Sequence, residues 1–112
     1  MENAIEIRHY VSRAGRDIYD EWLTSLGDRR TQAKITERIN RIAGGNFGDC
    51  KPLGQGLWEL RIDWGPGYRV YYAVVGRELV LLVSGGDKRR QSADIELAMN
   101  YLTDYRARGQ KP

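Results

Sequence analysis

The feature that most constrains the fold is a run of three strand-like segments joined by short turns. Residues 58–64 alternate apolar and charged side chains, as a strand with one buried face does. A Gly-Pro-Gly sequence at 65–67 predicts a turn into a second strand at 68–75. Residues 76–77 fit a two-residue hairpin turn before a third strand at 78–84, which is apolar on both faces and therefore predicted to be central. Consecutive hairpins of this kind require an antiparallel sheet.

The rest of the chain adds one strand and three helices. Residues 4–8 alternate as a short strand, whereas residues 12–26 and about 29–43 carry apolar side chains at helical spacing. The glycine-rich segment 44–56 is predicted to be a loop, and residues 91–106 a final helix. The expected order is β-α-α-β-β-β-α. The predicted class is α+β, with two N-terminal helices packed on a twisted antiparallel sheet.

The two N-terminal helices need one apolar face of the sheet to cover. We expect that face to consist of Trp58, Leu60, Ile62, Val70, Tyr72 and Val74. The opposite face is then polar and open, with Val80 and Leu82 on it. Matching the apolar faces across the turn at 65–67 places Ile62 opposite Val70 and Arg61 opposite Tyr71. The third strand is expected to end at residue 84, because two glycines follow it.

In that arrangement several basic residues gather at one end of the open face. Arg61, Arg69 and the segment Lys88, Arg89 and Arg90 meet there, with Lys51 at the rim and Gln91 following. Clustered guanidinium and ammonium groups bind phosphate and stabilise extra charge on a reacting phosphorus. Tyr71, with Tyr10 near it, could stack on a base. The competing interpretation is a solvated charged face on which Arg69 merely pairs with Asp63.

Length and composition exclude several classes of protein. The chain has 112 residues, which predicts a single domain over 1–112. One cysteine, Cys50, excludes an internal disulfide and a cysteine-cluster zinc site, and His9 alone excludes a histidine-rich metal site. No apolar run is long enough to span a membrane, and the N-terminus lacks the pattern of a signal peptide. We therefore expect a soluble, cytoplasmic protein without a metal or other cofactor. A net charge of +3 permits an anionic partner without requiring one.

Four segments together resemble a known family. They are NFGDCKPLG at 46–54, WELRI at 58–62, GPGYRVYY at 65–72 and GGDKRRQSADI at 85–95. In order and spacing they resemble the bacterial "addiction module killer proteins" of the RelE/ParE toxin superfamily, close to its HigB branch. The resemblance covers about residues 4–102.

The resemblance implies a RelE-like fold and the toxin of a type II toxin–antitoxin system. RelE-like members cut messenger RNA on the ribosome, without metal, by attack of a 2′-hydroxyl on the adjacent phosphate. By position, the implied catalytic residues are Arg61, Arg69 and Lys88 or Arg89. From their place around these residues, the candidate RNA-binding residues are Lys51, Tyr71, Arg89, Arg90 and Gln91.

The chain departs from RelE at two positions. Glu59 stands where RelE has a second basic residue on the strand, and the RelE tyrosine falls at or near Ile95, which cannot transfer a proton. The general base is therefore unassigned, with Lys88 as the first candidate and Glu59 as the second. Asp94 is expected to cap or pair at the start of the last helix.

The resemblance leaves two other functions open. ParE-like relatives share the fold and poison DNA gyrase without nuclease chemistry, and a degenerate toxin would act only by binding its antitoxin. The implied partners are a cognate antitoxin, usually a small helix-turn-helix protein, and mRNA on the ribosome, with no membrane. A homodimer and a heterotetramer with the antitoxin both remain open.

Overall fold

The structure, a computed structural model, describes residues 5–109. In chain order the elements are β1 (Glu6–His9), α1 (Ile18–Ser25), α2 (Arg29–Ala43), β2 (Cys50–Gly54), β3 (Leu57–Ile62), β4 (Tyr68–Val75), β5 (Leu79–Asp87), the single 3-10 turn η1 (Lys88–Arg90) and α3 (Gln91–Ala107). The α+β class is confirmed, but the predicted order is wrong because it lacks β2. Ala4, the predicted start of the first strand, lies outside the described residues.

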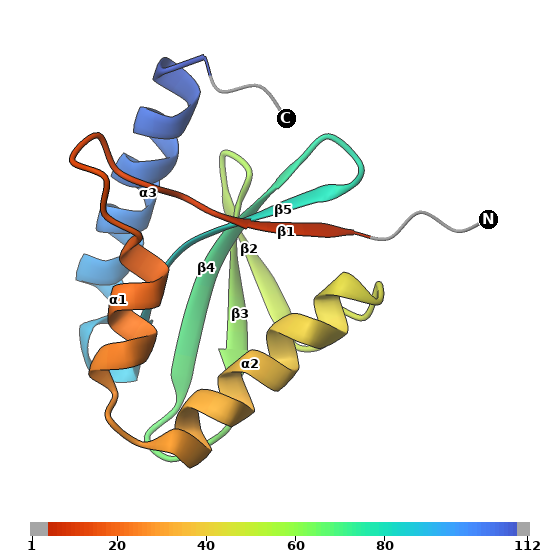
Figure 1. Cartoon of the computed structure of the whole chain (residues 1–112), viewed down its shortest axis with the longest axis vertical. Helices are drawn as coiled ribbons and strands as arrows, with labels where there is room; N and C mark the ends of the chain where they lie inside the picture. The colour runs from red at the N-terminus through yellow and green to blue at the C-terminus, as the bar shows by residue number, and fades with distance from the viewer. Residues whose placement is uncertain (1–4, 110–112) are drawn as a thin grey trace.

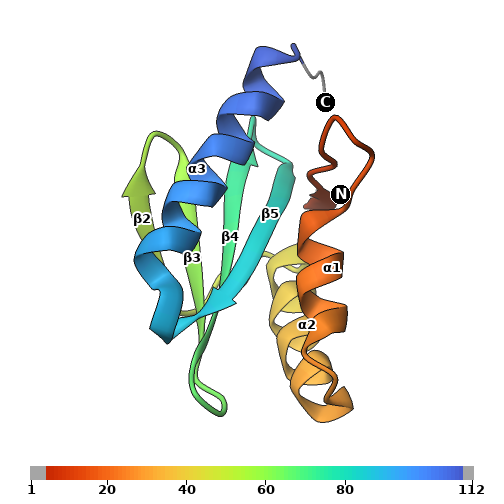
Figure 2. The same cartoon turned by 90° about the vertical axis from the view of Figure 1, so that its left-hand side faces the viewer.

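Five strands form one sheet in the order β1-β5-β4-β3-β2. The pairs from β2 to β5 are antiparallel, whereas β1 runs parallel to β5 at the other edge. Helices α1 and α2 cover one face of this sheet, and α3 lies across the other (Figures 1 and 2). The molecule therefore has three layers, with β4 at the centre of the middle one.

The face under α1 and α2 is the predicted core. Leu60, Ile62, Val70 and Tyr72 are buried there against Ile35, Ile39 and Ile42 of α2. Val74 departs from the prediction, since 42% of its surface is exposed. Val80 and Leu82 also belong to this cluster and not to the opposite face, because their cross-strand partners are Val74 and Tyr72.

The prediction of a polar, open opposite face is wrong. Helix α3 covers it with Ala98 and Leu102, which pack with Tyr71, Ala73, Leu81 and Val83 of the sheet into a second buried cluster. Burial of apolar area on both faces explains why β5 is apolar from Leu79 to Val83. At the end of the sheet near the β3–β4 turn, Arg61 and Arg69 remain partly exposed on this face.

The β3–β4 register differs from the prediction by two residues. Val70 pairs with Leu60 and not Ile62, and Arg61 pairs with Arg69 and not Tyr71. The strand stops at Ile62 because Trp64 turns away, its indole N–H donating to the Thr31 hydroxyl on α2 at 3.1 Å. A two-residue shift keeps every side chain on the same face, so the apolar pattern alone could not detect it.

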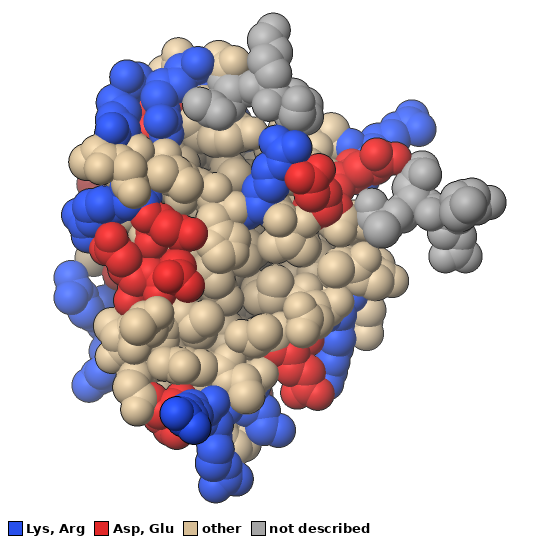
Figure 3. Space-filling model, viewed as in Figure 1, with Lys and Arg blue, Asp and Glu red and all other residues tan. Residues whose placement is uncertain are grey.

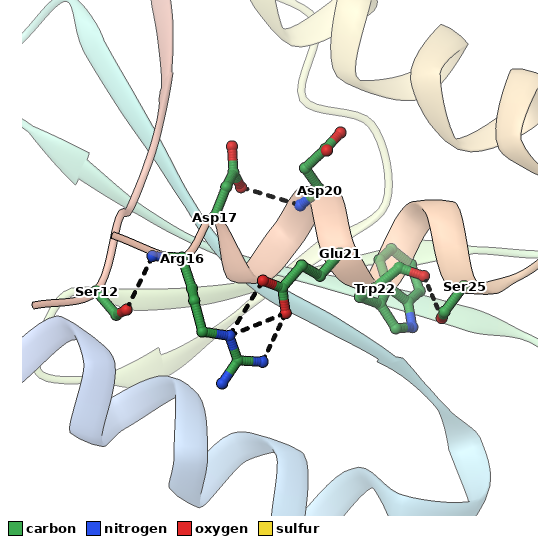
Figure 4. Close-up of polar contacts among 7 residues, drawn as sticks. All are labelled: Ser12, Arg16, Asp17, Asp20, Glu21, Trp22 and Ser25. Carbon is green, nitrogen blue, oxygen red and sulfur yellow. Dashed lines mark hydrogen bonds and ion pairs between the residues drawn. The ribbon is translucent and has the colours of Figure 1, made fainter. Parts of the chain in front are cut away.

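Helix α1 begins later than predicted, at Ile18 rather than residue 12. The Asp17 carboxylate accepts a hydrogen bond from the Asp20 N–H at 3.0 Å and caps the helix (Figure 4). The residues before it form a turn in which the Arg16 N–H donates to the Ser12 hydroxyl, and the Arg16 guanidinium pairs with Glu21 (Figure 4). Helix α2 matches its predicted bounds, with Asp28 as its N-cap.

Strand β5 continues through two glycines that were predicted to end it. A Cβ on Gly85 would lie 2.2 Å from the Trp22 ring of α1, and one on Gly86 would lie 2.0 Å from the Asp94 carboxylate of α3. The glycines thus allow helices on both faces to approach the strand closely. They do not break it.

The face formed by α1 and α2 carries acidic and basic side chains interspersed around an uncharged centre (Figure 3). It is therefore not a surface of a single charge. Within residues 5–109, no helix has the length and apolarity needed to cross a membrane.

Candidate functional site

A hollow of about 210 Å³ lies where the β3–β4 turn meets the end of β5. It is lined by Asp49, Arg61, Ile62, Asp63, Gly67, Arg69 and Lys88. The structure thus brings together the three cations that the sequence singled out for catalysis, from three separate segments of the chain.

Arg61 and Arg69 are direct cross-strand partners and point to the same face of the sheet. Both contact the carboxylate of Glu59, which is fully buried: Arg61 Nε lies 3.2 Å and Arg69 Nε 3.4 Å from Glu59 Oε2. The Arg61 side chain is 38% exposed and that of Arg69 only 12%. The arginines therefore reach the hollow from a partly buried, ion-paired position.

Lys88 reaches the hollow from the opposite side. Its backbone N–H donates to the Gly67 carbonyl at 3.3 Å, which ties the end of β5 to the β3–β4 turn. Gly67 has a φ of 90°, and a Cβ there would lie 3.0 Å from Lys88 Cδ. A glycine at this position therefore suits both the turn and the path of the lysine side chain.

Arg89 and Arg90 are exposed beside the hollow, at the start of α3. With Lys88, Gln91, Ser92 and Ala93 they line an adjoining, wider depression. The Arg89 guanidinium donates to the Asp87 carboxylate at 2.9 Å, and this hydrogen bond lowers the pKa of Asp87. The two depressions share Lys88, so they form one continuous basic edge.

Gln91 is half-buried and also contacts the buried carboxylate beside the arginines. Its side-chain N–H donates to Glu59 Oε1 at 2.7 Å. Asp94, in the first turn of α3, packs on Gly86, and burial raises its pKa. Asp94 does not cap α3, because the N-cap residue is Arg90.

The interpretation of Tyr71 as a base-stacking residue is wrong, because α3 covers its ring completely. Its hydroxyl has no hydrogen-bond partner among the described residues. Burial raises the pKa of Tyr71, and the negative charges of Glu59 and Asp94 add to the rise. The ring therefore contributes to the core and cannot reach a ligand in the hollow.

Lys51, Ile95 and His9 do not line the hollow. Lys51 is exposed on the edge strand β2, opposite Glu59, and Ile95 packs at the margin of the cluster under α3. His9 lies next to α1, with its Nδ1 2.7 Å from the Asp17 carboxylate. Cys50, expected in a loop, is a half-buried residue of β2.

Sequence reasoning missed the place of Glu59 and of the rim residue Asp49. It considered Asp63 as the partner of Arg69, which instead contacts Glu59. A charged residue in the middle of an apolar strand was the available signal for Glu59, but its burial depends on α3. Within residues 5–109, the His, Cys, Asp and Glu side chains form no group of three that could hold a metal ion.

Comparison with known proteins relates this chain to a protein family and to a bacterial relative. Residues 21–102 match the family model described as "Phage derived protein Gp49-like (DUF891)". An uncharacterized protein of Haemophilus influenzae is 50% identical to this chain over 80 residues, which make up 71% of this chain and 81% of that relative. The matched segment contains every residue that lines the hollow.

Proposed function

The chain belongs to the Gp49-like family of phage-derived proteins, a toxin-like family, and from this premise we propose that it is an mRNA-cleaving toxin of a type II toxin–antitoxin pair. The proposed activity is a metal-independent endoribonuclease acting on mRNA in the ribosome. The proposed fold relationship is to RelE, near the HigB branch of that superfamily.

The observation that carries this proposal is the convergence of Arg61, Arg69 and Lys88 on one hollow. Arginine binds the non-bridging oxygens of a phosphodiester in a bidentate manner, and cations placed there stabilise the charge that builds up on phosphorus. Arg89 and Arg90, exposed alongside, suit the flanking phosphates of a single strand. Lys51, on the exposed edge strand, is a further candidate for such a contact.

The proposed reaction is an internal transfer. The 2′-oxygen of one nucleotide attacks the adjacent phosphorus, the bond from phosphorus to the 5′-oxygen breaks, and the products are a 2′,3′-cyclic phosphate and a 5′-hydroxyl. Arg61 and Arg69 hold the phosphate, and Lys88 assists the movement of the proton from the 2′-hydroxyl to the leaving oxygen. Tyr71 takes no part in this scheme because it is buried.

A toxin-like family implies an antitoxin as partner. We propose a small helix-turn-helix protein encoded next to this chain, which binds it in the cytoplasm and keeps it inactive. This partner can be tested in two ways. The neighbouring open reading frame should encode such a protein, and its product should co-purify with this chain.

The test of activity is a brief induction of the chain in bacteria, followed by mapping of new RNA 5′ ends across the transcriptome. Arg69→Ala serves as the site variant and Arg77→Ala, in the exposed β4–β5 turn, as its matched control. We expect new ends confined to translated regions with the wild type and Arg77→Ala, and none with Arg69→Ala. Purified ribosomes with a defined mRNA should show the same cuts, with 2′,3′-cyclic phosphate and 5′-hydroxyl ends on the products.

Other outcomes point to other functions. Growth arrest with a DNA-damage response and no new RNA ends would indicate a gyrase poison and would reduce the basic hollow to a binding surface. Expression without any growth arrest, in the absence of an antitoxin, would indicate a degenerate toxin that acts only as a binding module.

A further inference from the structure

Glu59 is the most unusual residue near the hollow, because its carboxylate is 0% exposed in the middle of the sheet. A buried charge is costly unless cations and hydrogen-bond donors surround it. Glu59 has all of these: Arg61 and Arg69 at Oε2, and the Gln91 amide at Oε1. It does not itself line the hollow.

We propose that Glu59 is a positioning residue that fixes the orientation of Arg61 and Arg69 toward a phosphodiester in the hollow. This inference rests on the proposed function for its ligand, but the arrangement of the three side chains can be tested without it. Glu59 is then neither an RNA contact nor the general base.

The atoms involved support this role. The shortest contact of each arginine with Glu59 is through Nε. One terminal nitrogen of Arg69, Nη1, donates to the Tyr68 carbonyl at 3.2 Å, while the terminal nitrogens of Arg61 donate no hydrogen bond to another described residue. Arg61 Nε donates a hydrogen bond to Glu59 Oε2, whereas Arg69 Nε lies beside the same oxygen as an ion pair without a hydrogen bond among the described residues. Both contacts leave terminal N–H groups available for phosphate oxygens.

The charges support it as well. Two like charges placed directly opposite on adjacent strands repel each other. Glu59 stands one position before Arg61 in the same-face row of β3 and offsets one of the two positive charges. The two arginines and the Glu59 carboxylate together carry one net positive charge. This charge matches the single negative charge of a phosphodiester.

Gln91 orients the carboxylate in turn. By donating to Oε1, it directs Oε2 to the arginines and links the site to the start of α3. A carboxylate engaged at both oxygens and shielded from the hollow is poorly placed to accept the proton of a 2′-hydroxyl. Glu59, the second candidate for the base, is therefore better assigned to holding the arginines.

The first test measures side-chain order by NMR, from the Nε–Hε signals of the arginines in the full chain. We expect resolved, rigid signals for Arg61 and Arg69 in the wild type, and an averaged signal for the exposed Arg77. Glu59→Gln should abolish that rigidity at both arginines. Glu37→Gln is the matched control, since it removes an exposed carboxylate that lies 3.7 Å from Arg41 on α2 and should change neither signal.

The second test measures cleavage on ribosomes carrying a defined mRNA. Glu59→Gln should lower kcat at least tenfold, leave KM equal or lower because a negative charge is lost, and preserve the shape of the pH–rate profile. Gln91→Ala should lower kcat less, in the same direction. Loss of one limb of the pH profile in Glu59→Gln would overturn the positioning role in favour of a general base.

The two tests separate the failure of this inference from failure of the proposed function. If the wild type cuts no RNA, the proposed function fails and the NMR measurement alone decides the role of Glu59. If Glu59→Gln does not fold, the wild-type signals and Gln91→Ala decide it. Mobile Arg61 and Arg69 side chains in the wild type, or a Glu59→Gln protein with wild-type kcat, would overturn the inference.

Discussion

Arg61 and Arg69 lie directly opposite each other on β3 and β4, and both contact the same buried oxygen of Glu59. Such a pair is unfavourable between two free arginines, because like charges meet across the strands. The arrangement is stable only as a set of three, which makes each member sensitive to the loss of another.

Arg69→Lys keeps the positive charge but removes the planar, forked donor group. A lysine ammonium cannot contact Glu59 and the phosphate as the guanidinium does, so we expect activity to fall about tenfold to a hundredfold, or about 1.4–2.7 kcal/mol in the transition state. The cleavage rate on programmed ribosomes measures this. Arg77→Lys, in the exposed β4–β5 turn, is the control, and equal activity of the two variants would contradict a bidentate role for Arg69.

Tyr71→Phe removes a buried hydroxyl that has no partner among the described residues. Because a buried, unpaired polar group costs about 1–3 kcal/mol, we expect stability to stay the same or to rise by up to about that amount. Toxicity should not change. Thermal unfolding and growth arrest measure the two effects, and a clear loss of toxicity with intact folding would restore Tyr71 to the site.

Gly85→Ala places a methyl group 2.2 Å from the Trp22 ring in the present arrangement. Since α1 or the strand must then shift, we expect a loss of about 1–3 kcal/mol in the free energy of unfolding, measured by denaturant titration. Gly44→Ala is the control, because a Cβ there lies 3.5 Å from its nearest neighbour and φ is −87°. Equal stability of both variants would show that the contact between α1 and β5 is looser than described.

Asp104 makes stability depend on pH. The hydrogen bond from the Tyr10 hydroxyl, together with Arg13 and Arg108, lowers the pKa of Asp104 in the folded state. Its contribution is therefore complete above the ordinary pKa of an aspartate, about 3.9, and is lost as the pH falls through the lower folded value.

Asp104→Asn should accordingly lower Tm at pH 7, and the difference from the wild type should shrink toward pH 2. Glu96→Gln removes an exposed carboxylate from the same helix and serves as the control. A Tm difference that is the same at both pH values would show that the effect of Asp104 is not electrostatic.

Strands β3 and β4 could be predicted because alternation marks their buried faces directly, and β5 because a short apolar run follows a hairpin turn. Their register could not, since a shift of two residues leaves the same side chains inside, and the Trp64–Thr31 contact that decides it joins distant parts of the chain. The edge strand β2 was missed because Pro52 and flanking glycines are typical of loops, although Pro52 is tolerated at an edge.

The cations of the site could be predicted from motif position, because the turn and the end of β5 must lie near each other in any such sheet. Their buried partner could not. Whether Glu59 faces solvent or protein depends on where α3 packs, and the apolar spacing of α3 shows that it covers something without showing what. Tyr71 was interpreted wrongly for the same reason, because the sequence does not show that α3 covers its ring.

The parallel pairing of β1 with β5 joins residues 6–9 to residues 79–82, which lie 73 positions further along the chain. Pairings so distant in sequence close late and slowly during folding, because most of the chain must be ordered first. On the ribosome that synthesises it, a growing chain can complete neither this edge of the sheet nor the basic hollow before residue 88 has emerged. Assembly of the hollow is thereby delayed until the segment that carries Lys88 has left the ribosome.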